Sequence, residues 1–191
     1  MNASAATPAL PRTQSALLRN TLAIVLGSLF VAICAHLSVP LLFTPVPITL
    51  QPFAVLLLGL LLSPGAAAGA LVVYLVEGAL GLPVFAPHGP GGMLQLLGPT
   101  GGYLLSYPFA AALTSWLSRR LTPGAFVSAL LAAATGDAVI LLSGAAWFAV
   151  LQPHTFAAIL TLSVLPFLPG DILKVIAAAG VTTGWRRFRR S

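Results

Sequence analysis

Charge is the property that this sequence lacks most. Its 191 residues include three acidic residues and one lysine, and only 6% of the chain is charged, whereas 58% is hydrophobic. A water-soluble domain of this size could not cover its surface with so few charges. The composition therefore excludes a soluble globular domain and indicates an integral membrane protein. The apolar runs are continuous and rich in Leu and Ala rather than alternating, which argues against a transmembrane β-barrel.

Other absences argue against catalytic and cofactor sites. The single cysteine, Cys34, cannot form an intrachain disulfide. The only lysine, Lys174, does not lie in a G-x-x-x-x-G-K-[ST] motif, so the chain by itself is not a P-loop ATPase. No H-E-x-x-H or G-x-S-x-G motif occurs, and the three histidines are far apart in the sequence: His36, His88 and His154. We therefore expect a protein that is not an enzyme and that carries no metal or cofactor.

Long apolar runs are what the sequence has in abundance. Because a bilayer core about 30 Å thick requires about 20 helical residues, we predict an all-α integral membrane protein with six transmembrane helices and irregular external loops rich in Pro and Gly. The predicted spans are residues 21–39, 53–62, 65–80, 103–117, 123–150 and 171–183. Residues 152–165 are also apolar, and the sequence leaves open whether they span the membrane, re-enter it or lie on its surface.

The arginines predict the orientation of the chain. They all lie outside the apolar runs: Arg12, Arg19, Arg119, Arg120, Arg186, Arg187, Arg189 and Arg190. By the positive-inside rule, this distribution places both termini in the cytoplasm of a multi-pass protein of the cell membrane. We accordingly expect a cytoplasmic tail at residues 1–18, a six-helix membrane domain at 19–185 and a basic cytoplasmic tail at 186–191.

Two irregular segments predict an external pocket. Residues 40–52 contain four prolines, and residues 81–102 contain seven glycines and four prolines, so we expect neither segment to be helical. Both are nevertheless apolar, and apolar backbone without a helix cannot face lipid. We therefore expect them to line a cavity on the outer face, the second as a lid or re-entrant segment. Pro166, Pro169 and Gly170 interrupt a third apolar run on the same face.

The third run continues into Asp171 and Lys174, two of the four acidic and lysine side chains in the chain. Their spacing of three places both side chains on one face of a helix. An ionisable pair within a membrane segment is a candidate functional site. One interpretation is a self-contained ion pair. The interpretation we favour makes Lys174 the counter-ion of an anionic ligand, with Asp171 orienting it or accepting ligand N–H groups.

Further candidates lie on the first and third spans. Glu77, near the end of the third span, is predicted either to form a structural hydrogen bond or to bind ligand. Small residues recur at helical spacing on the first span, at Ala23 and Gly27 and again at Ser28 and Ala32. Such spacing lets another helix approach closely, either within the chain or from a partner subunit.

Four motifs, in this order, resemble the BioY family of biotin-specific substrate-capture (S) components of energy-coupling factor (ECF) transporters. They are PVPITLQ at 45–51, YLVEGALGLPVFA at 74–86, LGPTGGY at 97–103 and PFLPGDILK at 166–174. The resemblance implies a six-helix membrane protein that binds biotin from outside. It also implies partners, a transmembrane coupling subunit and ATPase subunits, which alone would use ATP.

The resemblance also implies site residues. Asp171 and Lys174 match the family's ligand contacts, and the loops around Gln51 and Phe85 match its pocket walls. Thr49 and Gln51 are candidates for the ureido group of biotin, while Phe85, Tyr103 and Trp147 could pack on its apolar parts. The small residues Ala23, Gly27, Ser28 and Ala32 resemble the family's face for the coupling subunit. The sequence departs from the family at Pro90, where many members have a basic residue.

Two other functions remain open from the sequence. The chain could be an S component for another vitamin, which the motifs alone do not distinguish. It could also be a stand-alone secondary transporter coupled to protons through Glu77, Asp137 or Asp171.

Overall fold

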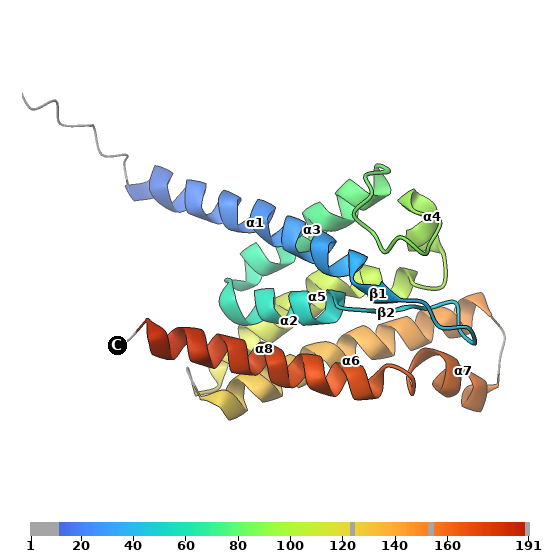
Figure 1. Cartoon of the computed structure of the whole chain (residues 1–191). Helices are drawn as coiled ribbons and strands as arrows, with labels where there is room; N and C mark the ends of the chain where they lie inside the picture. Colours follow the sequence, from blue (N-terminus) through green and yellow to red (C-terminus); the bar gives the residue numbers. More distant parts are fainter. Residues whose placement is uncertain (1–11, 123–124, 153–154, 190–191) are drawn as a thin grey trace, which may run out of the picture.

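The structure, a computed structural model, describes residues 12–122, 125–152 and 155–189 (Figure 1). Most of the predicted N-terminal tail, together with Pro123, His154 and Arg190, lies outside these residues. The described part contains eight helices and one pair of two-residue strands. The start of the first helix and the end of the last helix lie at the same end of the molecule, and the irregular segments gather toward the opposite end (Figure 1).

The elements follow the predicted spans closely. In chain order they are α1 (Arg12–His36), β1 (Ser38–Val39), β2 (Ile48–Thr49), α2 (Gln51–Leu61), α3 (Pro64–Ala79), α4 (Gly92–Leu97), α5 (Gly101–Arg120), α6 (Phe126–Leu151), α7 (Phe156–Ser163) and α8 (Leu168–Phe188). The strands pair antiparallel, with Ser38 opposite Thr49 and Val39 opposite Ile48, and this pairing closes the proline-rich loop between them.

Local sequence signals explain where the helices begin. Pro52 lies in the first turn of α2, where its missing N–H would have no helical partner. Ser63 caps α3, because its hydroxyl accepts a hydrogen bond from the Ala66 N–H at 3.4 Å, and Pro64 follows at the first helical position. Pro169 lies in the first turn of α8 in the same way. The prolines therefore end the irregular segments and start the helices that follow them.

Some helices differ in extent from the predicted spans. α1 begins at Arg12 and α8 ends at Phe188, and no proline lies between Pro11 and Pro40 or after Pro169 to interrupt either helix. The glycine-rich segment 81–102 is not wholly irregular, because it contains α4 and the first residues of α5. Gly91, directly before α4, and Gly92, its first residue, have φ of 66° and 58°, a backbone conformation that favours glycine.

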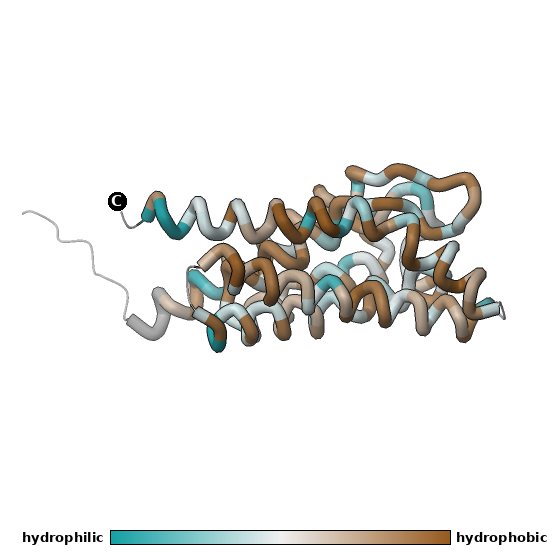
Figure 2. The backbone as a smooth tube through the Cα atoms, turned by 90° about the horizontal axis from the view of Figure 1, so that it is seen from below, coloured by the Kyte–Doolittle hydropathy of each residue, from teal (hydrophilic) through white to brown (hydrophobic). Residues whose placement is uncertain are grey.

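Apolar helices confirm the predicted class, an all-α membrane protein, and Figure 2 shows hydrophobic residues along most of the chain. Among the described residues, two helical stretches are long and apolar enough to cross a membrane, Ala16–His36 and Phe126–Leu151. α7 and α8 would form a third span if taken together, with a 49° bend between them. α2 and α3, with 11 and 16 residues, are shorter than the ~20 residues of a full span. With eight residues, α7 is too short to cross the bilayer alone.

α5 is the centre of the bundle, packing on α2, α3 and α6, and glycines allow these helices to approach closely. A Cβ on Gly59 of α2 would lie 2.8 Å from the Ala111 carbonyl oxygen of α5. A Cβ on Gly102 of α5 would lie 2.2 Å from the Trp147 Cβ and 2.6 Å from the Ser143 carbonyl oxygen, both on α6. In lipid, where apolar burial does not drive helices together, such close backbone approach is a main source of their association.

The small residues of α1 face the chain's own helices. A Cβ on Gly27 would lie 2.9 Å from the Ala70 Cβ of α3, Ser28 is fully buried and donates a hydrogen bond to the Glu77 carboxylate, and Ala32 is also buried. Gly27 and Ser28 therefore pack within the chain, as the first of the two alternatives expects, and a role of these small residues in docking a partner stays a prediction. The fourth, Ala23, is half-buried. The exposed face of α1 instead carries large aliphatic side chains: Leu22, Leu26, Leu29 and Ile33.

The close crossing of α5 and α6 yields a stability prediction. Gly102→Ala should lower the free energy of unfolding by about 1–3 kcal/mol, because the added methyl meets backbone atoms that cannot move aside. Gly180→Ala on the exposed face of α8 is the matched control, since a Cβ there meets nothing within 4 Å. The control should be neutral or stabilising by up to about 1 kcal/mol. Thermal unfolding in detergent measures both, and equal melting temperatures would contradict this account of the crossing.

Candidate functional site

A cavity of about 550 Å³, part of it open to solvent, lies at the end of the bundle where the irregular segments meet. All three segments singled out in the sequence contribute to its wall, together with α5, α6 and α8. Its polar lining residues are Thr49, Gln51, Gln95, Thr100, Tyr103, Tyr107, Asp171 and Lys174. The remaining lining is apolar: Val46, Pro47, Pro52, Ala86, Leu104, Ile140, Leu141 and Phe167. A mostly apolar cavity with a few convergent polar groups is typical of a small-molecule site.

The charged pair of α8 forms one wall of the cavity. Lys174 Nζ donates a hydrogen bond to Asp171 Oδ1 at 2.8 Å, and only 8% of Lys174 and 3% of Asp171 are exposed. Asp171 lies in the first turn of α8, where the helix dipole favours its negative charge. The Asp171 N–H also donates to the Phe167 carbonyl at 2.9 Å. The pair is thus held at a helix start, with both charged groups lining the cavity.

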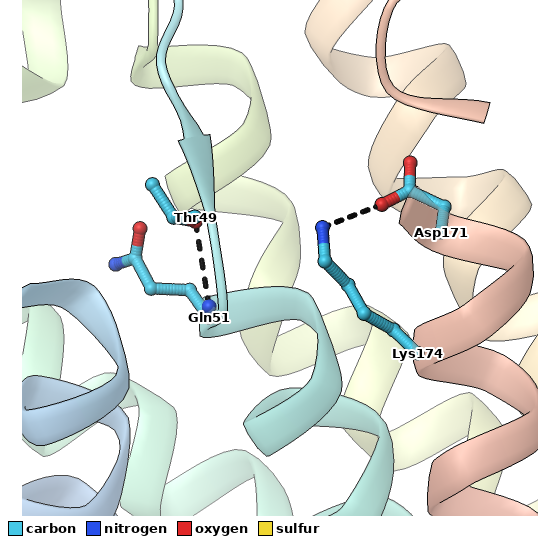
Figure 3. A network of polar contacts seen from close by, with 4 residues as sticks. All are labelled: Thr49, Gln51, Asp171 and Lys174. Atoms are coloured by element: carbon cyan, nitrogen blue, oxygen red, sulfur yellow. Dashed lines mark hydrogen bonds and ion pairs between the residues drawn. The ribbon is translucent and has the colours of Figure 1, made fainter. Parts of the chain in front are cut away.

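A second polar group lines the cavity from the start of α2. Figure 3 shows Thr49 and Gln51 on one side and the Asp171–Lys174 pair on the other. The Gln51 N–H donates to Thr49 Oγ1 at 3.3 Å, and Gln51 Nε2 donates to Tyr74 Oη at 2.5 Å. The side chain of Gln51 is therefore oriented by the buried Tyr74 of α3, at the point where the proline-rich loop becomes a helix.

Aromatic side chains form the third wall. Tyr103 Oη donates to the Ser163 carbonyl at 2.5 Å, which ties α5 to the end of α7. Its ring meets Phe167 edge-to-face, with centroids 6.1 Å apart. Tyr103 fits closely because Gly144 of α6 lies beneath it, where a Cβ would be 2.2 Å from the ring. This wall places two aromatic faces beside the charged pair.

The glycine-rich segment closes the cavity through Gln95, which the sequence analysis did not identify. Gln95 is 4% exposed, its Nε2 donates to Thr100 Oγ1 at 2.8 Å, and its Oε1 accepts from the Gly91 N–H at 3.3 Å. Close contact of its amide with Gly89 leaves no room for a side chain there, since a Cβ would lie 1.9 Å from Oε1. One buried amide thus joins the loop before α4 to the start of α5.

The predicted site residues divide into two groups. Thr49, Gln51, Tyr103, Asp171 and Lys174 converge on the cavity from three separate parts of the chain. Three other residues that the sequence predicted at the site, Phe85, Trp147 and Glu77, lie outside the lining of the cavity. Besides Gln95, the polar lining residues that sequence reasoning missed are Thr100 and Tyr107. A polar residue inside an apolar, glycine-rich run was the available signal for Gln95.

Phe85, Trp147 and Glu77 do not line the cavity. Phe85 packs edge-to-face on Tyr74, with centroids 5.4 Å apart, and covers Gly78, so it supports the wall from behind. Trp147 Nε1 donates to the Gly98 carbonyl at 3.0 Å. Glu77 accepts the hydrogen bond of Ser28 and so links α3 to α1. For Glu77, the structure therefore agrees with the structural alternative rather than with a ligand contact.

Asp137 is a further charged group near the site. It lies on α6 one turn before Ile140 and Leu141, it is 7% exposed, and its Oδ1 has no hydrogen-bond partner among the described residues. α6 packs against α8, the helix that carries Asp171 and Lys174. The sequence around Asp137 does not predict that it lies near α8, because this depends on how α6 packs against α8.

Comparisons with known proteins agree with this geometry. A family model described as the BioY family matches residues 5–191. The chain is 39% identical over 156 residues to the probable biotin transporter BioY of Pyrococcus horikoshii, covering 80% of this chain and 89% of that protein. It is 36% identical over 183 residues to the biotin transporter BioY of Rhodobacter capsulatus, covering 90% and 94%.

A solved structure is similar over nearly the whole chain. It is a crystal structure of the S-component for biotin from an ECF-type ABC transporter, with a TM-score of 0.83 and 26% identity. The match covers 94% of this chain and 95% of the other.

The contacts of Gln95 yield a prediction about the closure of the cavity. Gln95→Leu removes the acceptor of the Gly91 N–H, so hydrogen exchange at this amide should become at least tenfold faster. The Leu121 N–H, which donates to the Leu117 carbonyl at 3.0 Å at the other end of α5, serves as an internal control and should change less than twofold. Unchanged exchange at Gly91 would show that Gln95 does not hold this loop in place.

Proposed function

Because this chain belongs to the BioY family, we propose that it is the substrate-binding (S) component of a biotin uptake transporter, a multi-pass membrane protein rather than an enzyme. It captures biotin in the cavity described above, from the outer side of the cell membrane. The observation that carries this proposal is a buried charged pair and several oriented polar groups within an otherwise apolar cavity, in a chain whose curated relatives are biotin transporters.

The chemistry of biotin suits this cavity. Its fused rings and its valeryl chain are apolar and would pack on Tyr103, Phe167 and the aliphatic lining. Its ureido group has N–H donors and a carbonyl acceptor, which Asp171, Gln51 and Thr49 can satisfy. Its carboxylate needs a cation, and Lys174 is the only cation among the lining residues of the described chain. Because each buried polar group must find a partner, these contacts would select against molecules that lack them.

ATP hydrolysis would come from partner subunits. The sequence has no phosphate-binding loop, and its only lysine lines the cavity. We propose that a transmembrane coupling subunit and ATPase subunits of an ECF transporter assemble with this chain and use ATP to import the bound biotin. The exposed aliphatic face of α1, rather than its buried small residues, is available to such a partner or to lipid.

The arginines support an orientation with both termini in the cytoplasm. Arg119, Arg120, Arg186, Arg187 and Arg189 lie at the ends of α5 and α8, away from the cavity. The positive-inside rule places this end in the cytoplasm, so that the cavity opens outward.

Replacing Lys174 tests the site. Lys174→Ala should weaken biotin binding more than tenfold, the factor that corresponds to about 1.4 kcal/mol, because it removes the only cation of the lining and leaves Asp171 unpaired. Glu77→Gln also alters one charge in the apolar region, but outside the cavity, and should change affinity less than twofold. Isothermal titration of the purified variants, with a panel of other vitamins as competitors, measures both.

A second variant separates loss of binding from loss of folding. Asp171→Asn combined with Lys174→Met removes both charges together, so that no unpaired charge is buried. We expect this protein to melt near the wild-type temperature and still to bind biotin more than tenfold more weakly. Wild-type affinity in either well-folded variant would contradict the proposed site, and tighter binding of another vitamin would contradict the proposed substrate.

The buried carboxyl of Asp137 is the feature that a stand-alone, proton-coupled transporter would use. Liposomes that contain only this protein distinguish that function from ours. We expect biotin to bind but not to accumulate inside them along an imposed pH gradient. Accumulation in the wild type that is lost in Asp137→Asn would overturn the requirement for partner subunits.

A further inference from the structure

The ends of α5 and α8 share an arrangement that the biotin site does not use. Each helix has a tryptophan followed four residues later by an arginine that stacks on it. Arg120 lies 5.4 Å from the ring centroid of Trp116, and Arg189 lies 5.2 Å from that of Trp185. The two rings are 49% and 51% exposed, and both arginines are exposed as well. Two stacked, outward-facing cations thus lie at the ends of two long helices.

Neighbouring arginines hold these two ends close together. Arg119 Nη2 donates to the Leu62 carbonyl at 3.1 Å, and Arg186 Nη2 donates to the Leu60 carbonyl at 2.8 Å. Ser115 Oγ donates to the same Leu62 carbonyl at 2.6 Å. The last carbonyls of α2 are therefore satisfied by arginines from both α5 and α8, so the two Trp–Arg pairs belong to one end of the bundle. Figure 2 shows the hydrophilic stretch where α8 ends.

No acidic residue balances this positive charge. The sequence has only three acidic residues, and all lie elsewhere: Glu77 accepts from Ser28, Asp171 pairs with Lys174, and Asp137 is buried in α6. Arg119, Arg120, Arg186, Arg187 and Arg189 are concentrated at the two helix ends. Arg120 and Arg189, the two stacked cations, thus lie on a surface that carries none of the acidic side chains of the sequence.

We propose that this surface, the Trp–Arg pairs at Trp116–Arg120 and Trp185–Arg189, binds the phosphate groups of anionic phospholipids in the adjoining leaflet. Half-exposed tryptophan at a helix end is suited to the headgroup level of a bilayer, where one edge of the ring is apolar and its surroundings are wet. Arginine binds phosphate through a planar set of donors, and stacking on tryptophan holds that plane in place.

Lipid fits this surface better than an acidic protein does. On α8, the exposed Phe188 lies between Arg187 and Arg189, and Val181, five residues before Arg186, is exposed as well. A surface that alternates exposed hydrophobic side chains with cations matches acyl chains and headgroups together. This inference does not depend on which ligand the cavity binds, so its test is independent of the biotin titrations.

Lipid retention with matched single variants tests the proposal. The protein is purified in mixed micelles of phosphatidylcholine and phosphatidylglycerol, and bound lipids are counted by native mass spectrometry. We expect the wild type to retain phosphatidylglycerol preferentially, and Arg120→Gln and Arg189→Gln each to reduce this retention at least threefold. Arg19→Gln is the control, because it removes the same charge from an exposed position of α1, outside the two Trp–Arg pairs. It should reduce retention less than 1.5-fold.

Variants of the two tryptophans distinguish a specific lipid site from non-specific electrostatic attraction. Trp116→Leu and Trp185→Leu keep every arginine, and we expect each to reduce phosphatidylglycerol retention at least twofold. Equal losses of phosphatidylglycerol retention in Arg19→Gln and Arg120→Gln, or no effect of the tryptophan variants, would show that the lipid is attracted non-specifically by positive charge. Either result would overturn the proposal. So would the absence of any preference for phosphatidylglycerol. If Arg120→Gln and Arg189→Gln instead weakened only the binding of a purified coupling complex, the surface would be a protein interface.

Discussion

The ion pair between Lys174 and Asp171 is the constraint on which the rest of the site depends. Two charges in an apolar bundle are stable only if they are paired at short distance and if further polar groups surround them. The start of α8 meets the first condition, because Pro169 opens the helix and places Asp171 in its first turn, three residues from Lys174. The second condition is met by groups from other segments, so keeping the pair buried requires the loops to close over it.

The bundle is built to hold those loops in position. Close crossings at Gly59, Gly102 and Gly144 bring α2, α5 and α6 near enough for their backbones to touch side chains of the neighbouring helix. α2 is short, about 16 Å at 1.5 Å per residue, and its final carbonyls are bonded by Arg119 and Arg186. Its first residue, Gln51, is thereby positioned at the level of the ion pair. The first residue of α2 thus lines the cavity, while carbonyl groups at its other end accept hydrogen bonds from arginines.

Much of the site followed from the sequence, because the residues involved are chemically unusual in their surroundings. A lone lysine beside an aspartate, and Thr49 and Gln51 within a proline-rich apolar loop, stand out in a chain with few polar groups. Gln95 could have been found by the same reasoning. The roles of Phe85 and Glu77 were harder to predict, since a motif indicates which segment lies near the site but not the direction of each side chain. Phe85 supports a wall from behind, and Glu77 turns to Ser28 on α1.

The sequence by itself determined the class and the approximate helices and predicted the orientation, because the effects of hydropathy, prolines and arginines depend on the bilayer and the local backbone and not on distant contacts. Membership of the family followed from four motifs in order. Only the tertiary structure decided which faces of the helices are covered. It buried Gly27 and Ser28 against α2 and α3, brought Asp137 near the ion pair and joined the Trp–Arg ends of α5 and α8. These outcomes depend on how helices far apart in the sequence rotate and cross, and helical spacing alone does not specify that.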